Sequence, residues 1–228
     1  QEKLREFVKA GPIDVNIMTK LDREHDRRGQ LLPEYGSDAL SALRGFMNSR
    51  VNGSVVLSAG MNRRLFAYMG QFKDLLPDKC GDLQKRIILK VADYRSAFLQ
   101  GKMLAQLGLH VSEFRVESGL NCGGHAFGAK GMLMGPILDE FKRQKESLVN
   151  SLRSIREKAM ESLGYGETAE PAMARITVQG GIGTVHEDRL LREHYGVDGT
   201  GGATPFLFVP DVTNVDRESL RRLKAAQE

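Results

Sequence analysis

Two glycine-rich segments near the end of the chain could bind an anion. Residues 179–184 (QGGIGT) and 199–206 (GTGGATPF) each follow a short apolar run and precede a predicted helix. Consecutive glycines let a phosphate approach the backbone closely, and the first N–H groups of a helix favour an anion. In barrel enzymes, paired loops after the last two strands bind phosphate. The alternative interpretation of the first segment is a tight strand-to-helix turn with Thr184 as the cap. In the second segment, Thr204 before Pro205 indicates the start of a helix.

A third segment, residues 117–128 (ESGLNCGGHAFG), places one histidine after two glycines. His125 follows Gly123 and Gly124, where few side chains shield it from a ligand. A neutral imidazole can take a proton from an acidic carbon or donate a hydrogen bond. The alternative is a structural histidine, and Cys122 is interpreted as a small apolar filler. The other histidines are interpreted as surface residues: His25, His110, His186 and His194.

Lys90 interrupts the apolar run of residues 87–92 (IILKVA). A lysine in a buried strand needs a charge partner or a ligand. We expect either a carboxylate of the barrel interior, such as Glu113 or Glu117, or a bound group that carries negative charge.

These residues lie in or after short apolar runs that alternate with amphipathic helices. The predicted strands are residues 13–18, 55–59, 87–92, 111–117, 176–179 and 197–200. The predicted helices are residues 38–47, 94–107, 138–163 and 184–195, the last of which opens with a capping-box pattern from Thr184 to Glu187. Short buried runs flanked by helices are typical of parallel strands.

Strict alternation of strands and helices predicts an α/β fold, either a doubly wound sheet or a TIM-type (β/α)8 barrel. A barrel has eight strands and typically about 250 residues. Because the last turns resemble the final phosphate loops of a barrel, we expect about six parallel strands here, with the first two strands lying before residue 1. No linker divides the chain, so residues 1–228 are expected to form a single, N-terminally truncated domain. The charged loop of residues 20–36 is either functional or a solvated surface loop.

The composition limits the kinds of partner and location that we expect for the protein. The chain is 41% hydrophobic and 27% charged, which is typical of a globular protein. Its net charge of +4 is spread along the sequence, so a nucleic-acid partner is not expected. No stretch approaches the roughly 20 apolar residues that cross a bilayer. Cys80 and Cys122 have no partners at metal-site spacing, so we expect neither a disulfide framework nor a metal site, and a reducing, cytoplasmic location.

At the three loops the chain resembles the nitronate monooxygenases (2-nitropropane dioxygenase-like flavoproteins) and the related flavin-type enoyl-acyl-carrier-protein reductases. That family carries a strand ending in Gly-Gly-His, then a Gly-Gly-Ile turn, then a last strand running into Gly-Thr-x-Phe. The corresponding segments are GGH (123–125), GGI (180–182) and ATPF (203–206), with Ala203 in place of the family's glycine. Upstream, VNI (15–17) and VVLSAGMN (55–62) resemble the family's earlier strands.

The resemblance implies an oxidoreductase of the TIM-barrel type that uses flavin mononucleotide (FMN). The glycine turns would hold the FMN phosphate, and Asn16 would lie near the flavin. Lys90 would stabilise negative charge on the reduced flavin, and His125 would face the substrate as base or hydrogen-bond donor. The residues expected to bind the cofactor are Asn16, Lys90, Gly123, Gly124, Gly180, Gly181, Ile182, Gly202, Ala203 and Thr204.

Four functions are compatible with these features. The first is oxidation of a small activated carbon acid, such as a nitronate, by way of FMN. The second is reduction of an enoyl thioester by a nicotinamide donor, in which Arg23, Arg27 and Arg28 would meet an anionic carrier. The third is a flavin- or phosphate-binding protein without turnover, and the fourth is a phosphosugar barrel without flavin. The substrate would be a small molecule in the enzymatic cases, and a homo-oligomer is compatible with each.

Overall fold

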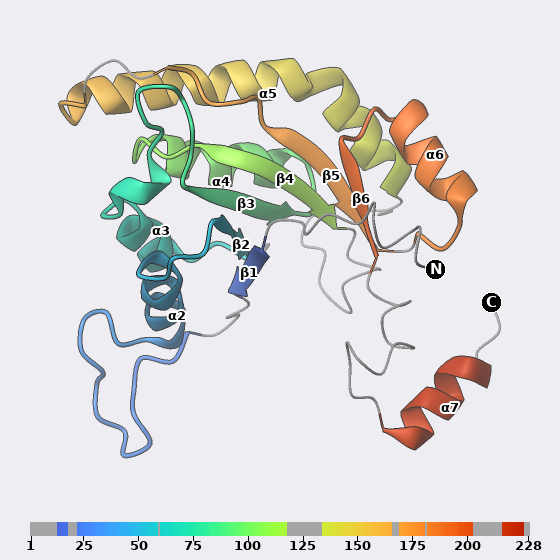
Figure 1. The fold of residues 1–228 in the computed structure, drawn as a ribbon, viewed down its shortest axis with the longest axis horizontal. Coiled ribbons are helices and arrows are strands. Elements are labelled where there is room, and N and C mark those ends of the chain that lie inside the picture. Colours follow the sequence, from blue (N-terminus) through green and yellow to red (C-terminus); the bar gives the residue numbers. More distant parts are fainter. Residues whose placement is uncertain are drawn as a thin grey trace.

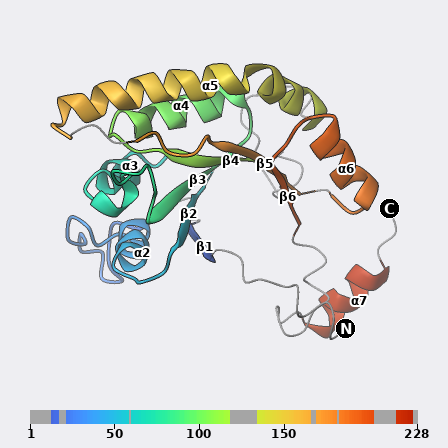
Figure 2. The same ribbon diagram turned by 45° about the horizontal axis from the view of Figure 1, so that its top comes forward.

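The computed structural model describes residues 13–17, 22–58, 60–117, 134–165, 169–180, 182–202 and 216–225. Within this part of the chain, six parallel strands form one sheet in the order β1-β2-β3-β4-β5-β6. Every strand therefore pairs with its neighbours in the sequence, and the sheet curls into a half-barrel (Figures 1 and 2). The strands are β1 (Ile13–Ile17), β2 (Gly53–Leu57), β3 (Lys85–Val91), β4 (Val111–Glu117), β5 (Arg175–Gln179) and β6 (Gly199–Gly201).

Helices α2 to α6 connect the strands and cover the convex side of the sheet (Figure 2). Their bounds are α2 (Asp38–Met47), α3 (Arg63–Met69), a 3-10 turn (Lys73–Leu75), α4 (Tyr94–Ala105), α5 (Met134–Ser162) and α6 (Val185–Glu193); α7 (Arg217–Ala225) follows the last strand. Two of them begin at capping boxes, which tie the side chains of Asp93 and Thr184 to the first free N–H groups of α4 and α6. None of the helices in the described residues has the length and apolarity needed to cross a membrane.

The two faces of the sheet differ in chemistry because successive side chains of a strand point to opposite faces. On the convex face, Leu89 and Phe114 lie in one continuous core with residues of α2 to α6. On the concave face, polar and charged side chains from β1 to β6 line a hollow of about 780 Å³. The half-barrel thus has its apolar core outside the sheet and a polar surface inside.

The curvature brings distant strands together across the hollow. Arg115 of β4 donates to the carboxylate of Asp14 on β1, with Nη2 3.3 Å from Oδ2. Its Nε donates to Glu113 at 2.8 Å, and Glu113 also accepts from the hydroxyl of Thr177 at 2.6 Å. Arg175 lies 3.8 Å from the same carboxylate. Charged side chains of three strands, β1, β4 and β5, therefore pair with one another on the concave face.

The predicted elements are largely present, with shifts at their ends. α2 and β4 have the predicted bounds, whereas α5 begins at Met134 rather than residue 138 and β3 begins at Lys85 rather than residue 87. Helix α3 was not predicted. Residues 22–36 of the charged loop are held to the body by Asp22, whose carboxylate accepts from the Ala39 N–H at 2.9 Å and the Ser37 hydroxyl at 2.8 Å.

Candidate functional site

The two glycine turns meet at the carboxyl end of the sheet. The N–H of Gly180, directly after β5, donates to the carbonyl oxygen of Gly201 at the end of β6, at 3.2 Å. Gly180 has a φ of 91°, a conformation that residues with a side chain rarely adopt. The hydrogen bond therefore joins the backbone of the two turns, and the conformation explains the need for glycine at this position.

Hydrogen bonds also join helix α6 to the end of β6. Asp188, in its first turn, accepts from the hydroxyl of Thr200 on β6 and from Arg192 one turn later. These hydrogen bonds lower the pKa of Asp188, with the Thr200 bond as the largest cause. The start of α6 and the end of β6 are thereby held together.

Two N–H groups directly before α6 already donate to a carboxylate of the chain itself. Glu187 Oε2 accepts from the N–H of Gly183 at 2.9 Å and from the N–H of Thr184 at 2.8 Å. The bond from Gly183 is the main reason that the pKa of Glu187 is lowered. A phosphate on these two N–H groups would have to displace the ionised carboxylate.

Lys90 and Glu117 form a buried ion pair at this end of the concave face. Lys90 Nζ lies 3.4 Å from Glu117 Oε1, and each side chain is 6% exposed. The prediction that a carboxylate of the interior partners Lys90 is confirmed, with Glu117 as that carboxylate. Glu117 pairs in register with Gln179, the residue before Gly180. The ion pair and the glycine turns therefore lie at the same end of neighbouring strands.

Of the other predicted site residues, some lie in the part of the chain that the structure describes and the rest lie outside it. Asn16 is exposed on β1, the opposite edge strand of the sheet from β6, on the same face as Asp14. Ile182 is half-buried and packs against the convex core, and Gly202 directly follows β6. Outside the described residues lie Gly123, Gly124, His125, Gly181, Ala203 and Thr204. Across the described ranges, no three His, Cys, Asp or Glu side chains are grouped so that they could hold a metal ion.

A second polar cluster lies at the amino end of the strands and was not predicted. It consists of His110, Arg153, Arg156 and Glu170, which we call the amino-end cluster. The interpretation of His110 as a surface residue was wrong, because the ring is half-buried and its Nε2 lies 3.1 Å from the carbonyl oxygen of Ala172. A carbonyl only accepts, so Nε2 carries the proton of the neutral ring. Burial, and then the charge of Arg156, lower the pKa of His110 to about 4.

This low pKa predicts that the protein loses stability in acid. Between about pH 6.5 and pH 4 the unfolded chain binds a proton at His110 that the folded chain does not, so the free energy of unfolding falls as the pH falls. The difference amounts to up to about 2 kcal/mol near pH 4.5, after allowance for water at the half-buried ring. Urea unfolding at pH 7.5 and about pH 4.5 should show a smaller loss in His110→Gln, whose amide can still donate to Ala172. Equal losses in the two proteins would contradict the expectation.

Comparison with family models, with curated protein sequences and with solved structures finds no match to this chain. The resemblance to the nitronate monooxygenases therefore rests on the short sequence motifs alone.

Proposed function

We propose that the protein is an FMN-dependent oxidoreductase of the nitronate monooxygenase type, built on a TIM-type barrel to which the six strands belong. The observation that carries the proposal is the hydrogen bond from Gly180 to Gly201, which supports a single phosphate cradle formed by the turns after two adjacent strands. The polar hollow of about 780 Å³ on the same sheet is large enough for a cofactor and a small substrate.

The described residues fit a phosphorylated cofactor in part. The backbone at Gly202 is open to a phosphate, since a methyl group added to Gly202 would meet no atom within 4 Å. Gly183 and Thr184 fit less well, because their N–H groups are bonded to Glu187. Because the Gly180 N–H already donates to Gly201, the phosphate would be held by N–H groups of residues 181–182 and 202–204, and Glu187 would weaken its binding by charge repulsion.

Each remaining residue has a role in the proposal. FMN would accept electrons from the substrate and pass them to oxygen. Lys90 would stabilise negative charge at the flavin ring, with Glu117 holding its ammonium group in place. Asn16 would contact the flavin from β1. His125, in the segment that follows Glu117, would orient the substrate or take a proton from its activated carbon.

The test begins with the absorbance spectrum of the purified full-length gene product. Flavin absorbance, and oxygen consumption with an alkyl nitronate that is lost in His125→Ala, are the expected results. Colourless protein that does not bind added FMN would overturn the proposal. Flavin-loaded protein that is inert with nitronates but oxidises a nicotinamide in the presence of an enoyl thioester would replace it with the reductase.

A substitution at Glu187 tests the phosphate cradle itself. Glu187→Gln removes the charge that faces the phosphate while its amide can still accept a hydrogen bond from the N–H groups. FMN should therefore bind several-fold more tightly to this variant, as measured by flavin fluorescence quenching. Glu193→Gln, on the last turn of the same helix, removes the same charge as a control. Equal effects of the two substitutions would show that the phosphate lies elsewhere.

A further inference from the structure

The start of helix α6 depends on polar contacts for its position on the sheet. Of the nine residues of α6, all of which the structure describes, Leu191 alone is buried. The other apolar contact of this region is the half-buried Ile182, which lies before the helix. Packing of an apolar face usually holds a helix in place, and the first turn of α6 has no buried side chain for it. Hydrogen bonds and ion pairs therefore fix this turn.

A closed ring of three side chains supplies those contacts. Asp188 of α6 accepts a hydrogen bond from the hydroxyl group of Thr200 on β6. Arg192, one turn later on α6, donates through Nε to Oδ1 and Oδ2 of Asp188 at 3.1 and 3.0 Å. Its Nη2 donates to Thr200 Oγ1 at 3.3 Å. Each member bonds to the other two, and we call this set the α6–β6 ring.

The ring also neutralises one of two adjacent carboxylates. Glu187 and Asp188 are the acidic residues in the first turn of α6. Arg192 pairs with Asp188, whereas Glu187 accepts from the backbone N–H groups before the helix. Arg192 therefore offsets one negative charge close to the glycine turns, where a phosphate would be repelled by it.

The first glycine turn is joined to β6 at both of its ends. At its start, the N–H of Gly180 donates to the carbonyl oxygen of Gly201 at 3.2 Å. At its end, the carbonyl oxygen of Thr184 accepts from the N–H of Asp188 at 3.2 Å, and the side chain of Asp188 is bound to Thr200. Because Thr200 and Gly201 are consecutive residues, one short stretch of β6 sets the position of the whole turn.

We propose that Asp188, Thr200 and Arg192 are positioning residues for the phosphate group of FMN. The ring holds the turn of residues 180–184 at the distance from the turn after β6 at which one phosphate contacts both. The inference rests on the proposed function, and the three side chains act through the glycine turns without touching the cofactor. Loss of the ring therefore weakens the hold on the phosphate and leaves the contacts of the flavin ring unchanged.

FMN and riboflavin, the same flavin without its phosphate, separate these two effects. Thr200→Val removes the hydroxyl group and keeps the branched shape that suits a strand. Flavin fluorescence of the purified full-length protein should show FMN binding weakened roughly fivefold, with riboflavin binding unchanged. Asp188→Asn should act in the same direction. The effects of the two substitutions should not add in the double variant, because both break one contact.

Arg192→Gln tests the charge of the ring. It should also weaken FMN binding, because it leaves the charge of Asp188 without its counter-ion. Arg189→Gln is the matched control, since it removes the same charge from α6 but breaks an exposed pair with Glu193 at 3.8 Å. It should leave the preference for FMN over riboflavin unchanged.

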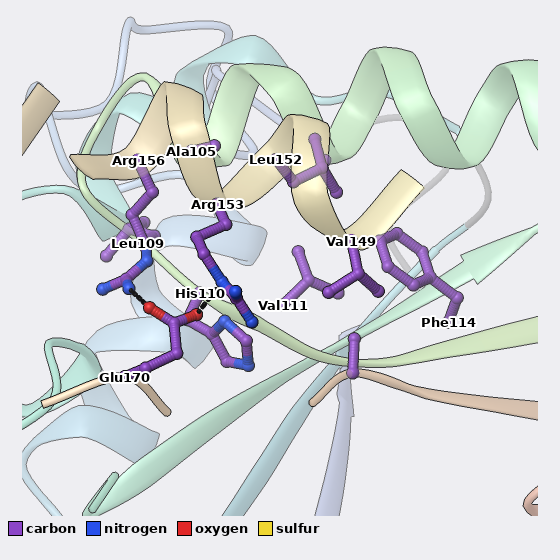
Figure 3. Close-up of a pocket in the computed structure, with 12 residues that line it drawn as sticks. Ala105, Leu109, His110, Val111, Phe114, Val149, Leu152, Arg153, Arg156 and Glu170 are labelled. Atoms are coloured by element: carbon purple, nitrogen blue, oxygen red, sulfur yellow. Dashed lines mark hydrogen bonds and ion pairs between the residues drawn. The ribbon is translucent and has the colours of Figure 1, made fainter. Parts of the chain in front are cut away.

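A variant at the other end of the strands shows what a general loss of stability does. Figure 3 shows Arg153 and Arg156 of α5 converging on Glu170 in the amino-end cluster. Glu170→Gln should lower the unfolding temperature, because Arg156 is 4% exposed and loses its counter-charge. The ratio of FMN to riboflavin affinity should stay at the wild-type value in this variant.

The outcomes separate this inference from the proposed function. A wild-type protein that binds neither flavin, or binds both equally, overturns the phosphate cradle and the inference with it. A wild-type protein that prefers FMN, and whose preference is undiminished in Thr200→Val and Asp188→Asn, overturns the inference alone. The same holds if Thr200→Val weakens both flavins equally, since the ring would then act on the fold and not on the phosphate.

Discussion

Glu117→Leu should lower the free energy of unfolding by about 3–5 kcal/mol, because it leaves the ammonium group of Lys90 buried without its carboxylate. Both side chains of the pair are 6% exposed, and Nζ and Oε1 are 3.4 Å apart. The apolar replacement cannot accept a hydrogen bond, and water has little access to the site. Urea unfolding monitored by far-UV circular dichroism measures the loss.

Two further variants show whether the loss comes from the broken pair. Lys90→Met/Glu117→Leu removes both charges and should recover most of the stability, since an apolar pair of similar volume often replaces a buried ion pair at little cost. Glu193→Leu breaks the exposed pair with Arg189 on α6 and should cost at most about 0.5 kcal/mol. A double variant as unstable as Glu117→Leu would mean that packing, and not charge, dominates at this site.

The same double variant separates the stability of the sheet from its proposed chemistry. If Lys90 stabilises negative charge on a reduced flavin, Lys90→Met/Glu117→Leu should fold and bind FMN but make the flavin harder to reduce, with a lower midpoint potential. An unchanged potential in flavin-loaded protein would assign Lys90 a structural role alone. The stability measurement and the potential therefore answer different questions about one ion pair.

The sequence was informative where a single rule dominated. The partner of Lys90 could be expected because a buried charge needs an opposite charge or several hydrogen-bond acceptors, and Glu117 lies on the neighbouring strand at the same end. The glycine turns could be expected because tight approach of backbone segments needs residues without side chains, as the φ of Gly180 illustrates. The Thr184 capping box was predicted from a local sequence pattern alone, and it is confirmed.

The sequence was uninformative where long-range contacts decide. The low pKa of His110 depends on burial of the ring and then on Arg156, 46 residues away on another element, and neither residue has a neighbour in the sequence that indicates the contact. The capping box at Glu187 was predicted, but not the consequence that its carboxylate occupies N–H groups expected to bind phosphate. The burial of Lys85 was not predicted, because a lysine at the start of a strand is usually solvated. Lys85 lies two and four positions before Ile87 and Leu89, and this spacing places it on the core face, but only if β3 is known to begin at Lys85.

Lys85→Met should lower the free energy of unfolding by about 3 kcal/mol. Lys85 is 1% exposed, and its ammonium group donates to the carbonyl oxygens of Phe46, Ser49 and Val51 at 2.9, 2.9 and 3.0 Å. It also lies 4.5 Å from the centre of the Phe46 ring. Methionine fills similar space but donates nothing, so carbonyl groups at the end of α2 and in the chain leading to β2 lose a charged donor.

Lys102→Met on the exposed side of α4 is the control for loss of a lysine charge, and it should change the stability by less than about 0.5 kcal/mol. Urea midpoints of the two variants give the comparison. Because the Lys85 contacts fix the end of α2 against the start of β3, hydrogen exchange should also quicken for the backbone N–H groups of Asn48 and Ser49, which donate to carbonyl oxygens of α2. A Lys85→Met protein with the wild-type midpoint would mean that the three carbonyl groups find other donors, and the ammonium group would then be a replaceable part of this junction.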